Sequence, residues 1–196
     1  MFEDLKECSL CRERVHVKTA KGAIDSPVSS CGSFDSPVLL LGRNPGVMEI
    51  RRGEPFVGPA GDRLNTILLG ADIPRKICYT TNVVKCFTPS GVGPSIGCRR
   101  RCIERWLTAE LSELKRLKLI ITFGNEALQY FEPDALVSQM HGYSVDEILE
   151  GSGLHVPIFV MFHPSAALRD SRINEKVVED TILLSTFWAK RNKEIK

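Results

Sequence analysis

The chain has 196 residues, of which 43% are hydrophobic and 26% are charged, and its net charge at pH 7 is +2. This length predicts one domain spanning residues 1–196 with a substantial core, and the small net charge does not by itself indicate a nucleic-acid partner. No stretch approaches the ~20 apolar residues that span a bilayer, and the polar, charged N-terminus is unlike a secretory signal. The seven cysteines are therefore expected in a reducing intracellular compartment, the cytoplasm or the nucleoid, as core thiols, metal ligands or nucleophiles.

Residues 3–12 predict a short helix or turn, and the glycine- and serine-containing stretch that follows to residue 36 predicts extended loop. Residues 38–42 form a short apolar run after a proline, which indicates a strand buried on both faces. The turn after this strand carries Asn44, whose backbone is restrained by the proline that follows it. A stiff turn at the carboxyl end of a buried strand is where open α/β sheets bind their ligands.

The rest of the chain alternates between helical and extended patterns. This alternation predicts an α/β fold of three layers, α/β/α, with a central, mainly parallel four-stranded sheet. Residues 132–155 look irregular, although an edge strand could lie there. Further strands are predicted at 77–84, 117–123 and 156–162, helices at 59–69, 100–117, 125–131 and 172–190, and loops at 43–58, 87–98 and 163–171.

Polar side chains lie at the ends of three predicted strands. Asn44 follows the first, Asn82 lies near the end of the second, and His163 follows the fourth. Because parallel strands end at the same edge of a sheet, these three side chains are expected to lie together. Phe56 lies in a loop broken by glycine and proline, where it either stacks on a flat ligand or anchors the loop under the sheet. Each residue alone has an ordinary structural explanation, but the set favours a binding site.

Two pairs of cysteines have the spacing of a four-thiolate metal site. Cys8 and Cys11 form a C-x-x-C pair, while Cys86 and Cys102 are separated by fifteen residues and flank a loop rich in glycine and proline. The group bound could be zinc or a 4Fe–4S cluster, and spacing alone does not decide between them. Cys98 competes with Cys102 as the fourth ligand.

Several segments, taken together and in order, resemble the uracil-DNA glycosylase superfamily, and specifically its iron–sulfur class, often called family 4. The matching residues extend from Cys8 to Arg169 and so cover most of the chain. The segments are Cys8-x-x-Cys11, Gly42-x-x-Pro45-Gly46, Gly53-Glu54-Pro55-Phe56-Val57-Gly58-Pro59-Ala60-Gly61, Thr81-Asn82-Val83-Val84-Lys85-Cys86, Cys102, and His163-Pro164-Ser165-Ala166-Ala167-Leu168-Arg169.

The resemblance implies a DNA-repair enzyme that flips uracil out of DNA and hydrolyses its N-glycosidic bond, leaving an abasic site. It implies that Phe56 stacks on the uracil, that Asn82 pairs with the base edge, and that His163 donates a hydrogen bond to uracil O2. It also implies a structural 4Fe–4S cluster rather than a redox-active one. The remaining implied roles are substrate binding by Gly42, Glu49 and Ser165, cluster binding by Cys8, Cys11, Cys86 and Cys102, and entry into the minor groove by Leu168 and Arg169.

The first motif departs from the family pattern. The family usually reads Gly-Glu-Ala-Pro-Gly, whereas this chain has Arg43 in place of the glutamate and Asn44 in the third position. The Gly-x-Asn-Pro-Gly pattern resembles the mismatch-specific and single-strand-selective branches, in which this asparagine positions the attacking water. Asn44 and His163 are therefore the expected catalytic residues, and the expected mechanism does not depend on a carboxylate at position 43.

Three hypotheses follow for the partner and the activity. The first is a monomeric uracil-DNA glycosylase acting on single- or double-stranded DNA, with Arg99, Arg100 and Arg101 contacting phosphates. The second is a damaged-DNA binding protein that keeps the fold but has lost efficient chemistry. The third is a zinc-stabilised α/β module with unrelated ligands.

Overall fold

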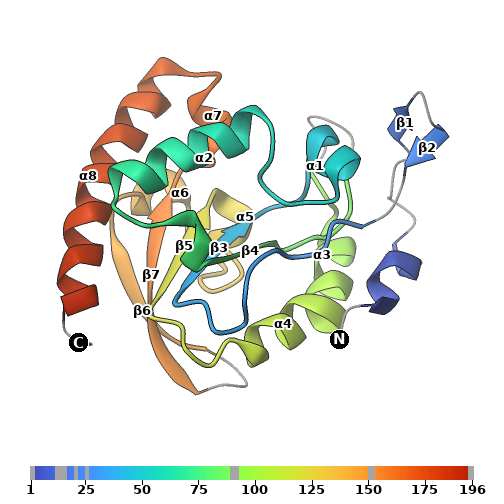
Figure 1. Ribbon diagram of the computed structural model, residues 1–196, viewed down its shortest axis with the longest axis horizontal. Helices are drawn as coiled ribbons and strands as arrows, with labels where there is room; N and C mark the ends of the chain where they lie inside the picture. The colour runs from blue at the N-terminus through green and yellow to red at the C-terminus, as the bar shows by residue number, and fades with distance from the viewer. Residues whose placement is uncertain are drawn as a thin grey trace.

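The computed structural model describes residues 3–11, 17–19, 22–24, 27–88, 93–149 and 153–193. Its centre is a five-stranded sheet in the order β4-β3-β5-β7-β6 (Figure 1). All neighbouring pairs are parallel except β6 and β7, which are antiparallel. The strands are β3 (Val38–Gly42), β4 (Cys78–Asn82), β5 (Leu119–Phe123), β6 (Ser144–Leu149) and β7 (Leu154–Met161).

The four predicted strands are present, and the first has the predicted bounds. The mainly parallel sheet is confirmed but has five strands rather than four, because β6 adds an antiparallel edge strand within residues 132–155, where a possible edge strand was expected. Ser144 and Asp146 of β6 are exposed, so this edge strand lacks the continuous apolar run that marks the buried ones. Every residue of β3, β4 and β5 is buried, which explains why their sequences read clearly as strands.

Helices cover both faces of this sheet (Figure 1). One layer contains α2 (Pro59–Gly70), α7 (Pro164–Ala167) and α8 (Ser171–Lys193), which contact one another. The other contains a continuous helical segment made of α3 (Ile96–Cys102), a π-helical stretch (Ile103–Leu107) and α4 (Thr108–Glu113). The shorter elements are 3-10 helices at Glu3–Glu7 and Arg75–Ile77, the hairpin β1 (Val17–Thr19) and β2 (Gly22–Ile24), α1 (Val47–Arg52), α5 (Asn125–Leu128) and α6 (Val137–Met140).

Three predicted loops contain short helices. The loop predicted at 43–58 includes α1, where the backbone N–H of Gly46 donates to Glu49 Oε2 at 3.1 Å and Gly53 ends the helix at φ 73°. The loop predicted at 87–98 ends in α3, because Ser95 Oγ caps that helix by accepting from the Cys98 backbone N–H at 3.1 Å. The loop predicted at 163–171 contains α7. Within the described residues, no helix is both long and apolar enough to cross a membrane.

Candidate active site and cysteine pocket

The polar groups at the strand ends meet in one pocket. Gly42 and Asn82 are register partners at the ends of β3 and β4, and His163 lies two residues after the end of β7. The sequence-based expectation that Asn44, Asn82 and His163 lie together therefore agrees with the geometry. The residues that line the pocket are Asn44, Pro45, Glu49, Phe56, Ala60, Asn82 and His163.

Phe56 forms a wall of this pocket and is 6% exposed. Its ring centroid lies 5.7 Å from that of His163, with 23° between the planes, and 5.6 Å from that of Phe123. The ring also packs on Gly42, where an added Cβ would lie 2.6 Å from the ring and 2.5 Å from Asn82 Oδ1. The ring is therefore buried, as expected for a residue that anchors its loop, and it also lines the pocket.

His163 is held as a neutral imidazole with its proton on Nε2. The Ser165 backbone N–H donates to His163 Nδ1 at 3.2 Å, and Ser165 Oγ lies 2.8 Å from the same atom. Because a backbone N–H can only donate, Nδ1 must accept, and the ring proton must be on Nε2. Burial, reinforced by the positive charges of Arg43 and Arg169, lowers the pKa of His163 to about 4. His163 can therefore donate one hydrogen bond through Nε2 at neutral pH.

The side-chain amide of Asn44 has a fixed orientation. Arg43 Nε donates to Asn44 Oδ1 at 2.8 Å, while Asn44 Nδ2 donates to Thr88 Oγ1 at 3.3 Å and to the Pro45 carbonyl at 3.2 Å. The guanidinium has only donors, so the Asn44 atom that faces it must be the oxygen. Thr88 is 5% exposed and was not a candidate from the sequence, where it lies in a loop far from Asn44.

Glu49 places a carboxylate in the pocket. Burial raises the pKa of Glu49, and hydrogen bonds from backbone N–H groups, including that of Gly46, oppose this shift. An added Cβ on Gly46 would lie 2.7 Å from Glu49 Oε2, so the glycine leaves room for this carboxylate.

A larger cavity continues from the pocket. It shares Asn44, Pro45, Glu49, Ala60 and His163 with the pocket. It adds three charged side chains, Arg43, Glu126 and Arg169, of which the sequence did not single out Glu126. Among these, Arg43 Nη1 forms an ion pair with Glu126 Oε1 at 3.3 Å. The further residues that line this cavity are Gly46, Thr88, Phe123, Gly124 and Ser165.

The residues expected to contact DNA lie in two places. Leu168 directly follows α7, is 53% exposed and precedes Arg169, which lines the larger cavity. Arg99, Arg100 and Arg101 lie on α3, which begins a few residues before the helix predicted at 100–117. Arg99 and Arg100 line a separate groove that also contains Glu126. The shared residue Glu126 makes this groove adjacent to the larger cavity.

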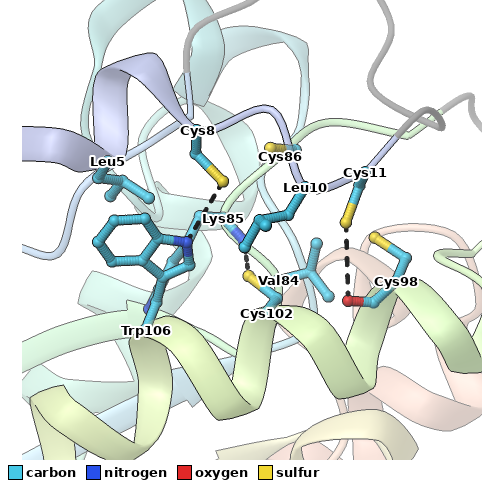
Figure 2. Close-up of a pocket in the computed structure, with 10 residues that line it drawn as sticks. All are labelled: Leu5, Cys8, Leu10, Cys11, Val84, Lys85, Cys86, Cys98, Cys102 and Trp106. Atoms are coloured by element: carbon cyan, nitrogen blue, oxygen red, sulfur yellow. Dashed lines mark hydrogen bonds between the residues drawn. The ribbon is translucent and has the colours of Figure 1, made fainter.

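Five cysteines line a second, mainly apolar pocket (Figure 2). It is formed by the N-terminal segment, the loop after β4, and the helical segment α3 with the π-helical stretch that follows it. The Lys85 backbone N–H donates to Cys102 Sγ at 3.3 Å, and Trp106 Nε1 donates to Cys8 Sγ at 3.4 Å. The residues that line it are Leu5, Cys8, Leu10, Cys11, Val84, Lys85, Cys86, Cys98, Cys102 and Trp106.

The helix that contributes Cys98 and Cys102 is shaped for this pocket. Residues spaced by four drift by about 40° per step around a regular α-helix. The wider π-helical turn after Cys102 opposes that drift and keeps Trp106 on the face of the helical segment that carries Cys98 and Cys102. Among the described residues, no three metal-ligating side chains stand at metal-binding distances. The thiol donors, the apolar lining and the N–H groups aimed at sulfur nevertheless suit an iron–sulfur cluster.

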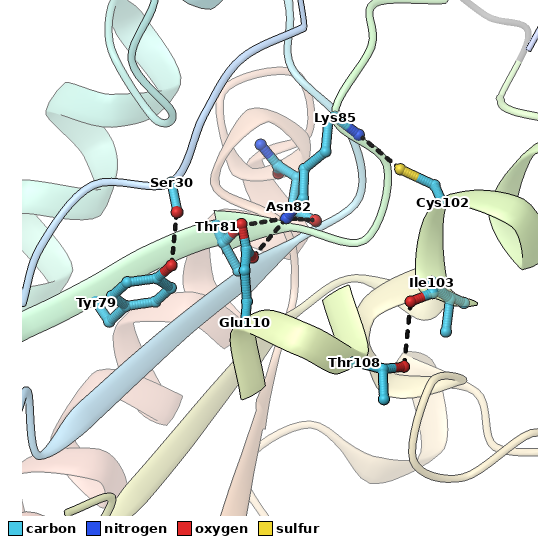
Figure 3. A network of polar contacts seen from close by, with 9 residues as sticks. All are labelled: Ser30, Tyr79, Thr81, Asn82, Lys85, Cys102, Ile103, Thr108 and Glu110. Carbon is cyan, nitrogen blue, oxygen red and sulfur yellow. Dashed lines mark hydrogen bonds and ion pairs between the residues drawn. The ribbon is translucent and has the colours of Figure 1, made fainter. Parts of the chain in front are cut away.

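A buried ion pair joins the two pockets (Figure 3). Lys85 Nζ donates to Glu110 Oε2 at 2.6 Å, to Thr81 Oγ1 at 2.6 Å and to the backbone carbonyl of Asn82 at 2.9 Å. The side chains of Lys85 and Glu110 are 1% and 0% exposed. Lys85 therefore contacts the backbone of Asn82, which lines the pocket at the strand ends, and it is the sequence neighbour of Cys86, which lines the cysteine pocket.

Comparison with known proteins agrees with this arrangement. A family model described as "Uracil DNA glycosylase superfamily" matches residues 29–183. A Type-4 uracil-DNA glycosylase of Thermotoga maritima is 29% identical over 192 residues, which is 96% of this chain and 93% of that protein. Type-4 uracil-DNA glycosylases of Archaeoglobus fulgidus and Pyrobaculum aerophilum are 30% and 26% identical, covering 78% and 92% of this chain and 77% and 89% of those proteins. The resemblance to this superfamily and to its family 4 class is confirmed, and the chain belongs to the uracil-DNA glycosylase superfamily.

Proposed function

We propose that this chain removes uracil from DNA by hydrolysing the N-glycosidic bond and leaves an abasic site. The observation that carries the proposal is the convergence of Phe56, Asn82 and neutral His163 on one pocket, in a chain of this superfamily. These groups supply a flat wall, an amide and a hydrogen-bond donor. A pyrimidine that has been rotated out of the DNA stack needs all three to be held by its face and both polar edges.

Uracil recognition follows from the chemistry of the side chains. The Asn82 amide has a donor for uracil O4 and an acceptor for uracil N3–H. Cytosine does not present an acceptor and a donor in this order along the same edge. Phe56 stacks on the base, and Gly42 allows the ring and the Asn82 oxygen to approach each other closely. Selectivity against thymine requires a group beside C5 of the base, and we assign this to Glu49, which lies in the same pocket.

Bond cleavage depends mainly on charge. The glycosidic bond breaks largely by dissociation, so negative charge gathers on the departing uracil and positive charge on the sugar. His163 Nε2 donates to uracil O2 and stabilises that negative charge, and a neutral ring does this without itself losing a proton. A water then attacks the sugar cation. Asn44 positions this water by hydrogen bonding and does not deprotonate it, because an amide is too weak a base.

The variant Asn44→Ala is expected to lose most of the excision rate but to keep its affinity for uracil-containing DNA. Alanine removes the amide that positions the water and leaves Phe56, Asn82 and His163 to hold the base. Single-turnover excision and fluorescence-anisotropy binding measure the two quantities separately. Asn65→Ala is the matched control, because Asn65 is exposed on α2. An Asn44→Ala rate equal to that of the wild type would remove Asn44 from the mechanism.

DNA is the proposed macromolecular partner, and the chain is proposed to act on it as a monomer inside the cell. We assign Leu168 to the position that fills the space left by the everted base, because it is a large exposed apolar side chain beside the larger cavity. We assign Arg169, with Leu168, to the segment that enters the minor groove, and we assign phosphate contacts to the arginines of α3, so binding weakens as salt rises. The arginines of α3 are Arg99, Arg100 and Arg101.

We also propose that Cys8, Cys11, Cys86 and Cys102 hold a 4Fe–4S cluster, with zinc as the alternative. The cluster would cross-link the N-terminal segment to the rest of the fold, and it takes no part in the cleavage described above. Cys98 lines the same pocket and remains a competitor of Cys102 for the fourth position.

Cys102→Ser is expected to lower iron content and the absorbance near ~400 nm that thiolate-to-iron charge transfer produces. Cys98→Ser distinguishes the two candidates for the fourth ligand, because only the true ligand should reduce cluster loading when it is replaced. Cys31→Ser is the matched control, since Cys31 is exposed and lies outside the pocket. Zinc without iron in the purified wild type would contradict the cluster assignment.

The experiment that tests the proposed function is a gel assay for alkali-labile breaks in an oligonucleotide with one uracil. The same oligonucleotide with thymine is the control, and oligonucleotides with hypoxanthine or xanthine define the range of bases accepted. Breaks at uracil but not at thymine are expected. Tight binding without breaks would instead support the second candidate, a damaged-DNA binding protein, which the arginine in place of the family glutamate favours.

A further inference from the structure

The cavity next to the base pocket contains an ion pair in the position where the family usually has a carboxylate. Arg43 occupies that sequence position, and its Nη1 lies 3.3 Å from Glu126 Oε1 at the start of α5. The Arg43 side chain is 41% exposed and that of Glu126 is 28% exposed. An ion pair this exposed contributes little to the stability of the fold, so its main effect is expected on the reaction in the cavity.

The pair is connected to the proposed water-positioning group. Through Nε, Arg43 donates to Asn44 Oδ1 at 2.8 Å, and through Nη1 it contacts Glu126. A guanidinium is planar, so fixing Nη1 also fixes the direction of the Nε–H bond. Glu126 therefore determines how Arg43 faces Asn44, and Arg43 determines which end of the Asn44 amide points to each neighbour.

The pair also matters for charge. Cleavage places a positive charge on the sugar, and the larger cavity, which continues from the base pocket, is the space open to that sugar. An unpaired guanidinium in the same cavity would oppose this positive charge. The charge of Arg43 reaches the reacting groups, since it contributes to the lowered pKa of His163. Glu126 supplies the compensating negative charge that the family glutamate is no longer there to provide.

We infer that Glu126 is a positioning residue for uracil excision: it pairs with Arg43, thereby orients the Asn44 amide and keeps the cavity from opposing the sugar cation. This inference rests on the proposed function. The sequence offered no signal for Glu126, because it lies 83 residues from Arg43 and looks like an ordinary residue on the first turn of a helix.

The test is Glu126→Gln, measured by single-turnover excision and by DNA affinity. The excision rate is expected to fall about tenfold, the size of coupling found between contacting groups in one network. DNA affinity is expected to stay equal or to increase, because the variant has one negative charge fewer. Glu126→Asp keeps the charge and is expected to recover part of the rate. A Glu126→Gln rate equal to that of the wild type would overturn the inference.

Two further variants separate this role from a general charge effect. Glu104→Gln makes the same charge change beside Arg100 in the adjacent groove and is expected to alter the rate by roughly twofold or less. The double variant Arg43→Gln/Glu126→Gln removes both charges and is expected to excise faster than Glu126→Gln alone. Arg43→Gln alone is measured as well. If the rate effects of Arg43→Gln and Glu126→Gln simply multiply in the double variant, the two side chains are not coupled and the inference is contradicted.

A measurement without substrate tests the pair independently of activity. The Arg43 Nε–H signal in ¹H–¹⁵N spectra reports its hydrogen bond to Asn44, and it is expected to move in Glu126→Gln but not in Glu104→Gln. An Arg43 signal that is unchanged in Glu126→Gln would show that Glu126 does not hold the guanidinium. If the wild type failed to excise uracil, the proposed function would fall, and this signal would still decide whether the pair orients Arg43.

Discussion

Replacing Glu110 with alanine is expected to destabilise the fold by about 3–5 kcal/mol, the usual cost of removing one member of a buried ion pair. The variant would leave Lys85 Nζ charged and 1% exposed, with only Thr81 Oγ1 and the Asn82 carbonyl as remaining acceptors. Urea unfolding followed by circular dichroism measures the loss of unfolding free energy. Glu104→Ala is the control, because Glu104 lies on the same helical segment and its side chain is 66% exposed.

The double variant Lys85→Met/Glu110→Leu separates stability from function. Apolar side chains of similar size replace both charges, so most of the lost stability is expected to return. The variant still lacks the hydrogen bond from Lys85 Nζ to the Asn82 carbonyl, so uracil excision is expected to remain slower than in the wild type. A Glu110→Ala protein as stable as the wild type would mean that the pair is not buried as described.

Replacing His163 with alanine is expected to lower the excision rate by about 10²–10³-fold, the effect of removing one donor from a site that stabilises a forming anion. The reason is that His163 Nε2 is the donor assigned to uracil O2, and alanine offers none. Single-turnover kinetics on a uracil oligonucleotide measures the loss. His155→Ala is the matched control, since His155 is exposed on β7. A His163→Ala rate within a few-fold of the wild-type rate would contradict the assigned role.

The pH dependence provides a second measure of the same residue. The pKa of His163 is lowered to about 4, so the ring is already neutral throughout the neutral range. Protonation would begin only as the pH falls towards 4, and the excision rate is therefore expected to be flat from about pH 6 to 8, a range in which an unperturbed histidine titrates. A wild-type rate that changes near pH 6.5, with that change absent in His163→Ala, would contradict a ring that is neutral throughout this range.

The sequence was sufficient for the features that depend on local pattern and on the geometry of parallel sheets. Residues 38–42 form a strand because their apolar run is buried on both faces. Asn44, Asn82 and His163 converge because the strands that precede them are parallel and end at one edge. The glycine- and proline-broken loop marked Phe56, and the family resemblance added Glu49; both residues line the same pocket.

The features that the sequence did not reveal depend on contacts between distant segments. Thr88 and Glu126 lie 44 and 83 residues from the partners that they contact, Asn44 and Arg43, and no local pattern marks them. Lys85 belongs to a recognised motif, but its partner Glu110 lies 25 residues away on a helix where it reads as a surface residue. Helix α1 was missed because glycine and proline around it suggested only a loop.

The central claim is that this pocket grips an everted uracil and makes it a better leaving group. The most direct test measures free uracil by mass spectrometry together with abasic sites, after incubation of the protein with DNA containing one uracil per strand. The account predicts one free uracil for each abasic site from the wild type, and a loss of both in Asn44→Ala and His163→Ala. Bound DNA from which no uracil is released would contradict it.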